Sequence, residues 1–152
     1  MSYFTAVVAR EGRTWVSHDL DVDSVEDLDE LTAEVRGVVD DEDLALVLVE
    51  REDVWWAVVR LDGEDDPRIF VSDQVGATSS PYSSILAIAE DDSDEDQVVV
   101  QGTCAGDFDL LTDLGTSPER LREMCDEEML PMDALAAVAE SAGFAEVLDS
   151  LR

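Results

Sequence analysis

The order of apolar and polar positions predicts two strands and a helix in the first quarter of the chain. Residues 3–10 alternate as in a strand, and Glu11 and Gly12 supply a turn before a second alternating run at 13–18. Apolar residues then recur at helical spacing, at Val25, Leu28, Leu31, Val35 and Val38. We therefore predict a β-hairpin followed by an amphipathic helix that ends near Gly37.

A second hairpin is predicted from two apolar runs, LALVLVE at 44–50 and VWWAVVRL at 54–61, with a three-residue connection between them. A further strand, RIFVS, follows at 68–72, which gives the order ββαβββ. The second run is apolar on both faces over 54–59 and is expected to be a central strand, with Trp55 and Trp56 in opposite layers of the core. Such a strand needs cover on each face, so we expect the first helix on one face and the later helices on the other.

The middle of the chain changes in composition twice, from a predicted helix to an acidic run and then to an apolar run. Ser80 before Pro81 is typical of a helix start, and we predict a short helix over 81–89. The run EDDSDED at 90–96 has no apolar member and is interpreted as a solvated linker. The following run at 97–104 is expected to add an edge strand or to cross back to the main lobe.

The last third of the chain has a helical pattern, with residues typical of helix starts and ends between its segments. The segment 107–115 ends at Gly115, 116–128 starts with a Ser-Pro cap, 129–143 ends at Gly143, and 144–151 closes the chain. Six residues are predicted to share the interior of these helices, namely Leu121, Met124, Cys125, Leu135, Val138 and Leu148. The predicted class is α+β, with a sheet of about five antiparallel strands in a domain at 1–89, an acidic linker at 90–97 and a helical lobe at 98–152.

Composition indicates a folded but strongly anionic protein. Hydrophobic residues make up 45% of the 152, enough for a real core, whereas 39 acidic residues against nine arginines give a formal net charge of −30. Such a surface repels phosphate backbones and anionic lipid heads, so direct binding to nucleic acid or membrane is not expected. A basic protein partner is favoured, and the alternative is that the charge serves only solubility or adaptation to salt.

The N-terminus and the two cysteines bear on location. The first ten residues lack the basic start and apolar core of a secretory signal, so we expect the protein in the cytoplasm. Cys104 and Cys125 lie 21 residues apart without CxxC spacing, and a reducing cytosol would keep both as thiols. The simplest interpretation is that both thiols are buried or have no chemical role.

The stretch HDLDVDSVEDLDE at 18–30 resembles a calcium loop in its spacing, with acidic residues at the first, third, fifth and twelfth places: Asp19, Asp21, Asp23 and Glu30. The sixth place, which needs glycine for a sharp turn, is Ser24, and the preceding residues alternate like a strand rather than a helix. We interpret the stretch as a strand-to-helix joint in which Asp23 caps the helix and Glu26 completes a capping box. No calcium-dependent change is expected.

Candidates for catalysis are few. The single histidine, His18, stands beside Asp19 at a strand end, and the sequence leaves open a pairing of His18 with Cys125. Two cysteines and one histidine without paired spacing are a poor zinc ligand set, and no hydrolase, metalloprotease or phosphate-loop motif occurs. We assign no catalytic, cofactor-binding or metal-binding residue. Near the end of the chain, Met129, Leu130 and Met132 form either an adaptable contact surface or gap-filling contacts between helices.

Several segments resemble one known family. The opening MSYFTAVVAREGRTWVSHDLD, the following VEDLDEL, the LVLVE strand and DLLTDLGTSPERLREMCDEEMLP at 109–131 are similar to the actinobacterial tRNA adenosine deaminase-associated proteins. The resemblance covers nearly the whole chain. It implies a companion of the deaminase, since the family takes its name from neighbouring genes, and it carries over no catalytic residue. The H-x-E and P-C-x-x-C elements of the deaminase itself are absent.

Three functions follow as hypotheses. The first is a non-catalytic accessory protein whose acidic surface binds a basic partner, with the tRNA adenosine deaminase as candidate. The second is a self-associating scaffold whose acidity reflects solubility alone, with no prediction of its oligomeric state. The third is an uncharacterised enzyme around His18 or Cys125.

Overall fold

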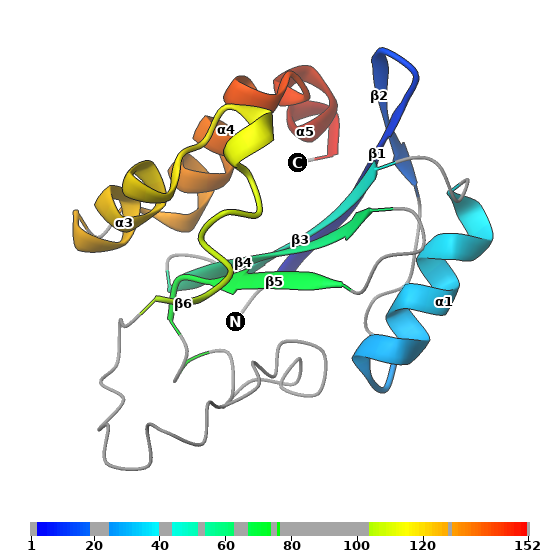
Figure 1. The fold of residues 1–152 in the computed structure, drawn as a ribbon, viewed down its shortest axis with the longest axis horizontal. Coiled ribbons are helices and arrows are strands. Elements are labelled where there is room, and N and C mark those ends of the chain that lie inside the picture. The colour runs from blue at the N-terminus through cyan, green and yellow to red at the C-terminus, as the bar shows by residue number, and fades with distance from the viewer. Residues whose placement is uncertain are drawn as a thin grey trace.

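A computed structural model of the chain describes residues 3–18, 25–39, 44–51, 54–62, 67–73, 76, 104–127 and 129–151. Its principal elements in chain order are β1 (Tyr3–Glu11), β2 (Thr14–His18), α1 (Leu28–Val38), β3 (Leu44–Arg51), β4 (Trp55–Asp62), β5 (Arg68–Val71), β6 (Ala105–Gly106), α3 (Pro118–Asp126), α4 (Pro131–Ala142) and α5 (Ala145–Leu151). They form an antiparallel sheet with helices on both sides (Figure 1). No helix within the described ranges is long and apolar enough to cross a lipid bilayer.

The sheet has six strands in the order β2-β1-β3-β4-β5-β6, and each strand is antiparallel to its neighbours. Val47 of β3 lies opposite Val7 of β1 and opposite Val59 of β4, which sets the register at the centre. The α+β class and the ββαβββ order are confirmed, and β4 is central as predicted. The short strand β6 adds a sixth member at the edge beside β5.

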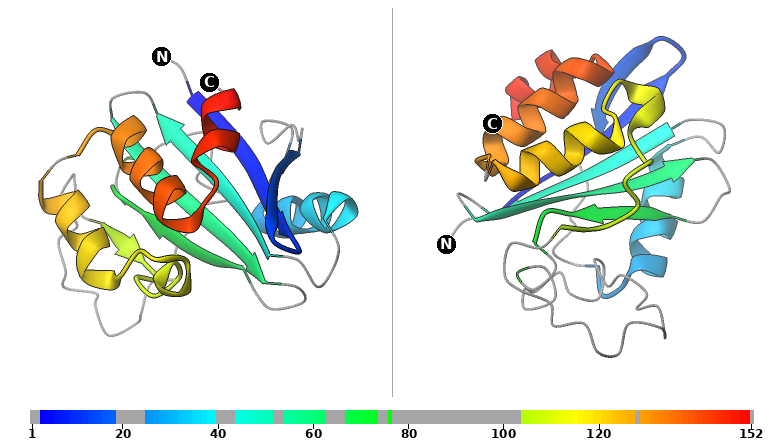
Figure 2. Two further views of the ribbon diagram at one scale, coloured as in Figure 1. Left: turned by 90° about the horizontal axis from the view of Figure 1, so that it is seen from above. Right: turned by 60° about the vertical axis from the view of Figure 1, so that its left-hand side comes forward.

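Side chains of the central strands alternate between two hydrophobic cores because successive residues of a strand point to opposite faces. Every residue of β3 from 44 to 50 is buried, so both faces of this strand are covered. We call the two sides of the sheet the α1 face and the α3–α5 face after the helices that cover them (Figure 2). Trp55 lies in the core of the α1 face and Trp56 in the core of the α3–α5 face, as predicted.

The start of α1 corrects one prediction. Asp27, rather than Asp23, is the N-cap: its Oδ1 accepts a hydrogen bond of 2.8 Å from the backbone N–H of Glu30. The Glu30 carboxylate in turn accepts a bond of 3.1 Å from the backbone of Glu26. The cap therefore lies four residues later than predicted, directly before the first helical residue, where an acceptor reaches the free N–H groups of the first turn.

The buried side of α1 is also shorter than the sequence pattern predicted. Leu31 and Val35 are fully buried against the sheet, whereas Val38, at the end of the helix, is 46% exposed. Val39 is buried in its place, because the chain leaves helical geometry at this residue and turns toward the sheet. The helix ends one residue beyond the predicted Gly37.

The C-terminal helices begin and end largely where the sequence places residues typical of helix starts and ends. The Ser117 hydroxyl accepts from the backbone N–H of Arg120 at 3.2 Å and so caps α3. Gly143 ends α4 with φ of 100°, a left-handed conformation that favours glycine. The six predicted interior residues all lie in or against the core of the α3–α5 face, with Cys125 partly buried.

The segment 107–115 was predicted to be helical, but it forms turns and a short 3-10 helix at Thr112–Leu114. It connects β6 to α3, and Leu110, Leu111 and Leu114 are all buried. A connector this short cannot offset the cost of starting an α-helix, so its contacts with the sheet decide its path.

Some predictions fall outside the described residues. These are the helix at 81–89, the acidic run at 90–96, most of the run at 97–104, and Asp19, Asp21 and Asp23 of the calcium-like loop. The division into 1–89, 90–97 and 98–152 stays a prediction. Sheet residues and C-terminal helices contribute together to the core of the α3–α5 face.

Candidate functional site

The calcium-like stretch contributes one described ligand candidate, Glu30, and its carboxylate is engaged at the start of α1. The residues before the loop form β2, which continues to His18, so a strand rather than a helix leads into it. The part of the chain that the structure describes contains no group of three or more His, Cys, Asp or Glu residues arranged to hold a metal ion.

His18 and Cys125 are not brought together. His18 ends β2, at one edge of the sheet, with its Nε2 3.7 Å from the Glu11 carboxylate. Cys104 directly precedes β6 at the other edge, and the pKa of Cys125, on α3, is raised by its interaction with Cys104. Five strand spacings of about 4.8 Å put these edges roughly 24 Å apart. The pairing that the sequence left open is therefore wrong, because β2 and β6 form opposite edges of the sheet.

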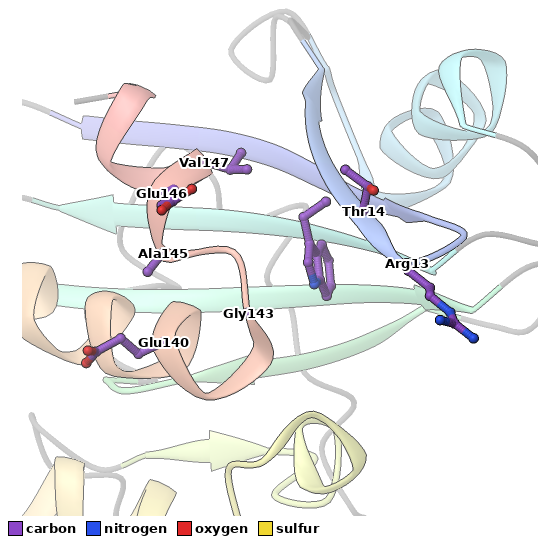
Figure 3. A pocket seen from close by; sticks show the side chains of 8 residues that line it. Arg13, Thr14, Glu140, Gly143, Ala145, Glu146 and Val147 are labelled. Carbon is purple, nitrogen blue, oxygen red and sulfur yellow. The ribbon is translucent and has the colours of Figure 1, made fainter.

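A pocket of about 420 Å³ opens between the start of β2 and the α4–α5 turn. Figure 3 shows its lining residues, which are Arg13, Thr14, Trp15, Glu140, Gly143, Ala145, Glu146 and Val147. Glu140 and Glu146 lie on one side of the pocket and Arg13 on the other. The lining combines apolar surface with two carboxylates and the Arg13 guanidinium and includes neither histidine nor cysteine, so the carboxylate side suits binding of a cationic or amphipathic group.

Trp15 gives this pocket a fixed wall. Its indole Nε1 donates a hydrogen bond of 3.1 Å to the carbonyl of Ala142, at the end of α4. Its ring lies 4.9 Å from that of Phe144, and the Arg10 guanidinium stands 5.9 Å from the Trp15 ring centroid. These contacts tie the first hairpin to the last two helices, which are distant in sequence, and hold the pocket in shape.

The carboxylates beside the pocket belong to a broader anionic surface. Residues 131–151 contain four acidic residues and no basic residue, and all four are exposed. Neither Glu140 nor Glu146 forms an ion pair with any residue in the described ranges. We call the exposed side of these helices the α4–α5 surface; its members are Leu130, Met132, Asp133, Ala136, Glu140, Glu146 and Asp149.

The α4–α5 surface also answers the question left open for the methionines. Leu130 is 47% and Met132 51% exposed, whereas Met129 packs against the core. Two of the three predicted contact residues therefore present apolar area to solvent next to Asp133, and the third fills a gap between helices. Apolar side chains within a polar surround are common at binding surfaces.

A buried arginine on the α3–α5 face is a feature that sequence reasoning missed. Arg60 of β4 is only 6% exposed, and it donates hydrogen bonds to Asp62 at 2.9 Å, to Asp113 at 2.5 and 2.7 Å, and to the carbonyl of Leu110. The Asp113 hydrogen bond raises the pKa of Arg60 above its usual value, and Arg60 in turn lowers the pKa of Asp113. Arg60 thus anchors the segment 107–115 to the sheet. The available signal was a charged residue inside a strand buried on both faces.

A second arginine extends this cluster toward the sheet edge. Arg68 of β5 donates from Nε to Asp107 at 2.5 Å, and its Nη1 lies 3.9 Å from the Asp62 carboxylate. The Asp107 bond raises the pKa of Arg68, and Arg68 lowers the pKa of Asp107. Each cation is matched by carboxylates, so the arrangement is that of a structural clamp.

The same region brings the two cysteines together. Cys104 directly precedes β6 and Cys125 lies near the end of α3; both are partly exposed, and the interaction between their thiols lowers the pKa of Cys104 and raises the pKa of Cys125. Sequence spacing gave no signal for this contact, because it depends on how the segment between them returns along the sheet edge.

Comparison with known families decides where the chain belongs. A model of Rv3753c-like tRNA adenosine deaminase-associated proteins matches residues 3–145. The chain belongs to this family. The match runs from β1 into the start of α5, and it confirms the resemblance found in the sequence. Neither a curated protein nor a solved structure matches the chain.

In this family member, two of the segments that resemble the family, the first ten residues and 109–131, contribute side chains to the core of the α3–α5 face. Residues 3–10 belong to β1, and 109–131 runs from the turns after β6 through α3 to the start of α4. The residues that line the pocket lie outside both segments, and of the two cysteines Cys125 lies within 109–131. The family name refers to an association with tRNA adenosine deaminase and names no reaction of the family's own.

Proposed function

We propose that this chain is a non-catalytic accessory protein of the cytoplasm that binds tRNA adenosine deaminase, and that the α4–α5 surface makes the contact. The observation that carries the proposal is the family match over residues 3–145, whose name records association with that enzyme. The net charge of −30 supplies the physical reason for binding, since a protein that grips tRNA presents cationic side chains to the phosphates.

Electrostatic complementarity determines how binding of the accessory protein affects access of tRNA to the deaminase. An anionic protein is drawn to the tRNA-binding surface of the deaminase at long range, and a like-charged tRNA is repelled from the complex. The accessory protein would then compete with tRNA or shield the cationic groove before tRNA arrives. Direct binding of the accessory protein to RNA has no support in a chain with so few and so dispersed cations.

The α4–α5 surface has the composition of a contact site. Leu130 and Met132 supply exposed apolar area, and Asp133, Glu140 and Glu146 supply carboxylates that no described cation neutralises. The pocket beside Trp15 can accept the stem of an arginine or lysine along its apolar wall while Glu140 and Glu146 meet the charged end. Apolar contact would then stabilise the complex, and charge would orient it.

The non-catalytic role is supported by the chemistry of the described residues. The lone histidine stands at a strand end near Glu11, at the edge of the sheet opposite to β6, so it is not placed to activate either cysteine thiol. The buried charges around Arg60 are paired with one another and anchor a connector.

The direct test is co-purification of this chain with a tRNA adenosine deaminase from the same organism, over a series of salt concentrations. We expect association at low salt that weakens as ionic strength rises above about 0.15 M, where the screening length falls to about 8 Å. Added tRNA should reduce the bound fraction. Absence of association at low salt would end the proposal.

A charge-matched pair of variants locates the contact. Glu140→Gln with Glu146→Gln removes two charges from the α4–α5 surface, and Asp29→Asn with Glu34→Gln removes two exposed charges from α1, on the other face of the sheet. The first variant should bind the deaminase several-fold more weakly than the second. Equal weakening would show that net charge, rather than this surface, determines binding.

Self-association through Leu130 and Met132 is the second candidate, favoured by their exposure of 47% and 51%. The net charge of −30 opposes it at low salt, so sedimentation should detect a dimer only at high salt. Leu130→Ser with Met132→Ser should abolish such a dimer. A monomer at every salt concentration would remove this candidate.

A further inference from the structure

The two edges of the sheet differ in length and regularity. One edge is β6, which has only two residues, and the other is β2, which pairs with β1 through five consecutive residues without a bulge. No strand in the described ranges lies beyond β2. An edge strand of this kind presents a row of backbone N–H and C=O groups with which another extended chain can pair.

Two residues of β2 direct these groups outward. The turn at 12–13 closes between Glu11 and Thr14, so this pair exchanges backbone hydrogen bonds. Bonded and non-bonded pairs alternate along an antiparallel ladder, and Trp15 and Ser17 therefore point their backbone N–H and C=O away from β1. Outside the sheet ladders, no backbone hydrogen bond within the described ranges involves Trp15 or Ser17. These groups are open to a further strand.

The composition of β2 lacks the features that protect edge strands. Natural edges are commonly protected by charged side chains, prolines or bulges. Thr14–His18 contains no proline, arginine, lysine or carboxylate, although 32% of the residues of the chain are charged. The side chains of Thr14 and Ser17 are exposed. This strand thus favours pairing with another strand rather than preventing it.

We propose that β2 accepts an extended basic segment of a partner protein as a seventh strand of the sheet, with an arginine or lysine side chain of that segment in the Trp15 pocket. The inference rests on the proposed function for the identity of the partner, and it adds the mode of recognition. Backbone pairing along β2 supplies affinity, and the pocket selects the side chain. A second copy of this chain is disfavoured as the occupant, because two chains with a charge of −30 repel each other.

The position of the pocket fits an added strand. Trp15 packs in the core of the α3–α5 face and lines the pocket together with Glu140 and Glu146. A strand added to β2 lies about 4.8 Å away from it. The residue of that strand directly opposite Trp15 points to the same face of the sheet. Its side chain therefore lies beside the Trp15 ring, at the pocket.

The neighbouring strand on the inner side already provides a cation at this ring. Arg10 of β1 lies directly opposite Trp15 in the ladder, and its guanidinium stands 5.9 Å from the ring centroid. A cation on a strand next to β2 thus reaches the Trp15 ring. The residue opposite Trp15 on an added strand is the counterpart of Arg10 on the outer side.

The carboxylates give the pocket its preference for a cation. Glu140 and Glu146 form no ion pair with any residue in the described ranges, and they lie on the side of the pocket away from Arg13 (Figure 3). A guanidinium or ammonium between the Trp15 ring and these carboxylates gains cation–π and charge-assisted contacts. An acidic side chain there would meet two like charges, so the segment is expected to be basic.

The first test uses the wild-type protein and a synthetic probe, an eight-residue peptide of alternating arginine and valine with acetylated and amidated ends. The control peptide has the same sequence with a methyl group on each arginine backbone nitrogen, so it keeps the charge but loses these donors. Fluorescence anisotropy should show the probe binding about tenfold or more tightly than the control, because strand addition depends on main-chain hydrogen bonds. Equal affinities would overturn the proposal, since charge alone would then explain the binding.

Amide hydrogen exchange of the wild type, measured by nuclear magnetic resonance, locates the added strand. With saturating probe peptide, the amides of Trp15 and Ser17 should exchange about tenfold or more slowly than in the free protein. The amide of Asp29, in the first turn of α1, should exchange as before. Unchanged exchange at Trp15 and Ser17 would contradict strand addition.

A pair of variants tests the edge from the side of the protein. Ser17→Pro removes an outward N–H at an edge position, where proline is tolerated, and Ser17→Ala is the matched control that keeps it. Ser17→Pro should bind the probe about fivefold or more weakly than Ser17→Ala, as expected for the loss of one hydrogen bond. Circular dichroism verifies folding, and equal binding by the two folded variants would contradict the proposal. The exchange measurement on the wild type decides the question independently of both variants.

Binding of the deaminase and strand addition fail separately in these experiments. Wild-type protein that binds the probe with protection of Trp15 and Ser17, but does not bind the deaminase, would support strand addition and end the proposed function. A deaminase that binds Ser17→Pro as tightly as Ser17→Ala would leave the proposed function intact and overturn strand addition. A wild-type dimer in sedimentation that Ser17→Pro abolishes would assign the edge to a second copy of the chain and likewise overturn it.

Discussion

The two faces of the sheet are built from the same strands but differ in chemistry. Among the described residues, the α1 face is covered by α1, whose Leu31 and Val35 lie on an aliphatic layer, and Trp55 is the aromatic member of that core. The α3–α5 face carries the paired Arg60, the Trp15 pocket and the two interacting thiols. One face thus serves mainly as core, whereas the other combines core with polar groups that come from distant segments.

The difference teaches where to look for function in such a fold. A face covered by one regular helix can satisfy its polar groups within that helix. A face covered by short helices and a turn-rich connector needs side chains to hold the connector in place, and Arg60 does so through Asp113 and the carbonyl of Leu110. Pockets and polar contacts arise at the joints between these pieces.

The largest expected effects test whether the two faces unfold together. Leu31→Ala on the α1 face and Leu135→Ala on the α3–α5 face each remove a fully buried side chain, and each should lower the free energy of unfolding by about 3 kcal/mol through the cavity created. Urea unfolding followed by circular dichroism and tryptophan fluorescence should give one coincident transition for both. Two separate transitions in Leu135→Ala would mean that the C-terminal helices unfold on their own.

Removing the buried cation should affect the α3–α5 face almost as strongly. Arg60→Met leaves the Leu110 carbonyl without this donor and Asp113 without its partner, so we expect a loss of about 3 kcal/mol in urea unfolding. Arg120→Met is the matched control, because Arg120 is 42% exposed in its pair with Glu123. Its expected loss is under about 0.5 kcal/mol. Similar losses in the two variants would show that burial of Arg60 contributes little.

Acid should diminish the contribution of the Arg60 and Arg68 cluster. The pKa values of Asp113 and Asp107 are lowered by Arg60 and Arg68, so their stabilisation is present above the unfolded value of about 3.9 and is lost as pH falls through the lower folded values. Acid also relieves the general repulsion of a chain with a charge of −30. The informative quantity is therefore the stability difference between wild type and Arg68→Met.

That stability difference should be largest at neutral pH and should shrink below about pH 4. Urea titrations at several pH values measure it, with Arg120→Met again as the control. A difference that is constant with pH would mean that the arginine contributes through packing of its stem rather than through its charge.

The smallest expected effects come from the helix caps, one on each face. Asp27→Ala and Ser117→Ala each remove an acceptor for a backbone N–H, and each should cost about 1 kcal/mol. Asp29→Ala, in the first turn of α1 but not its cap, should cost only about 0.3 kcal/mol. If Asp29→Ala equals Asp27→Ala, charge near the helix start matters more than the capping bond.

Much of the fold could be predicted because it is encoded over short distances. The two hairpins, the central strand β4 and the opposite placement of Trp55 and Trp56 follow from alternation, and Ser117 and Gly143 mark helix ends by local geometry. The N-cap of α1 was predicted wrongly because several nearby acidic residues could each serve as a cap. Several acids precede α1, and the choice of Asp27 as cap depends on which of them directly precedes the first buried turn.

The sequence by itself determined most of the described strands and helices and the α+β class, since repeats of two and 3.6 residues are properties of neighbouring positions. Only the tertiary structure decided that Arg60 meets Asp113, that Trp15 donates to Ala142, and that the thiols of Cys104 and Cys125 interact. These partners are 21 to 127 residues apart. No periodicity connects such positions, so they come together only when the chain path over the α3–α5 face brings β6, α3 and α4 back to the sheet.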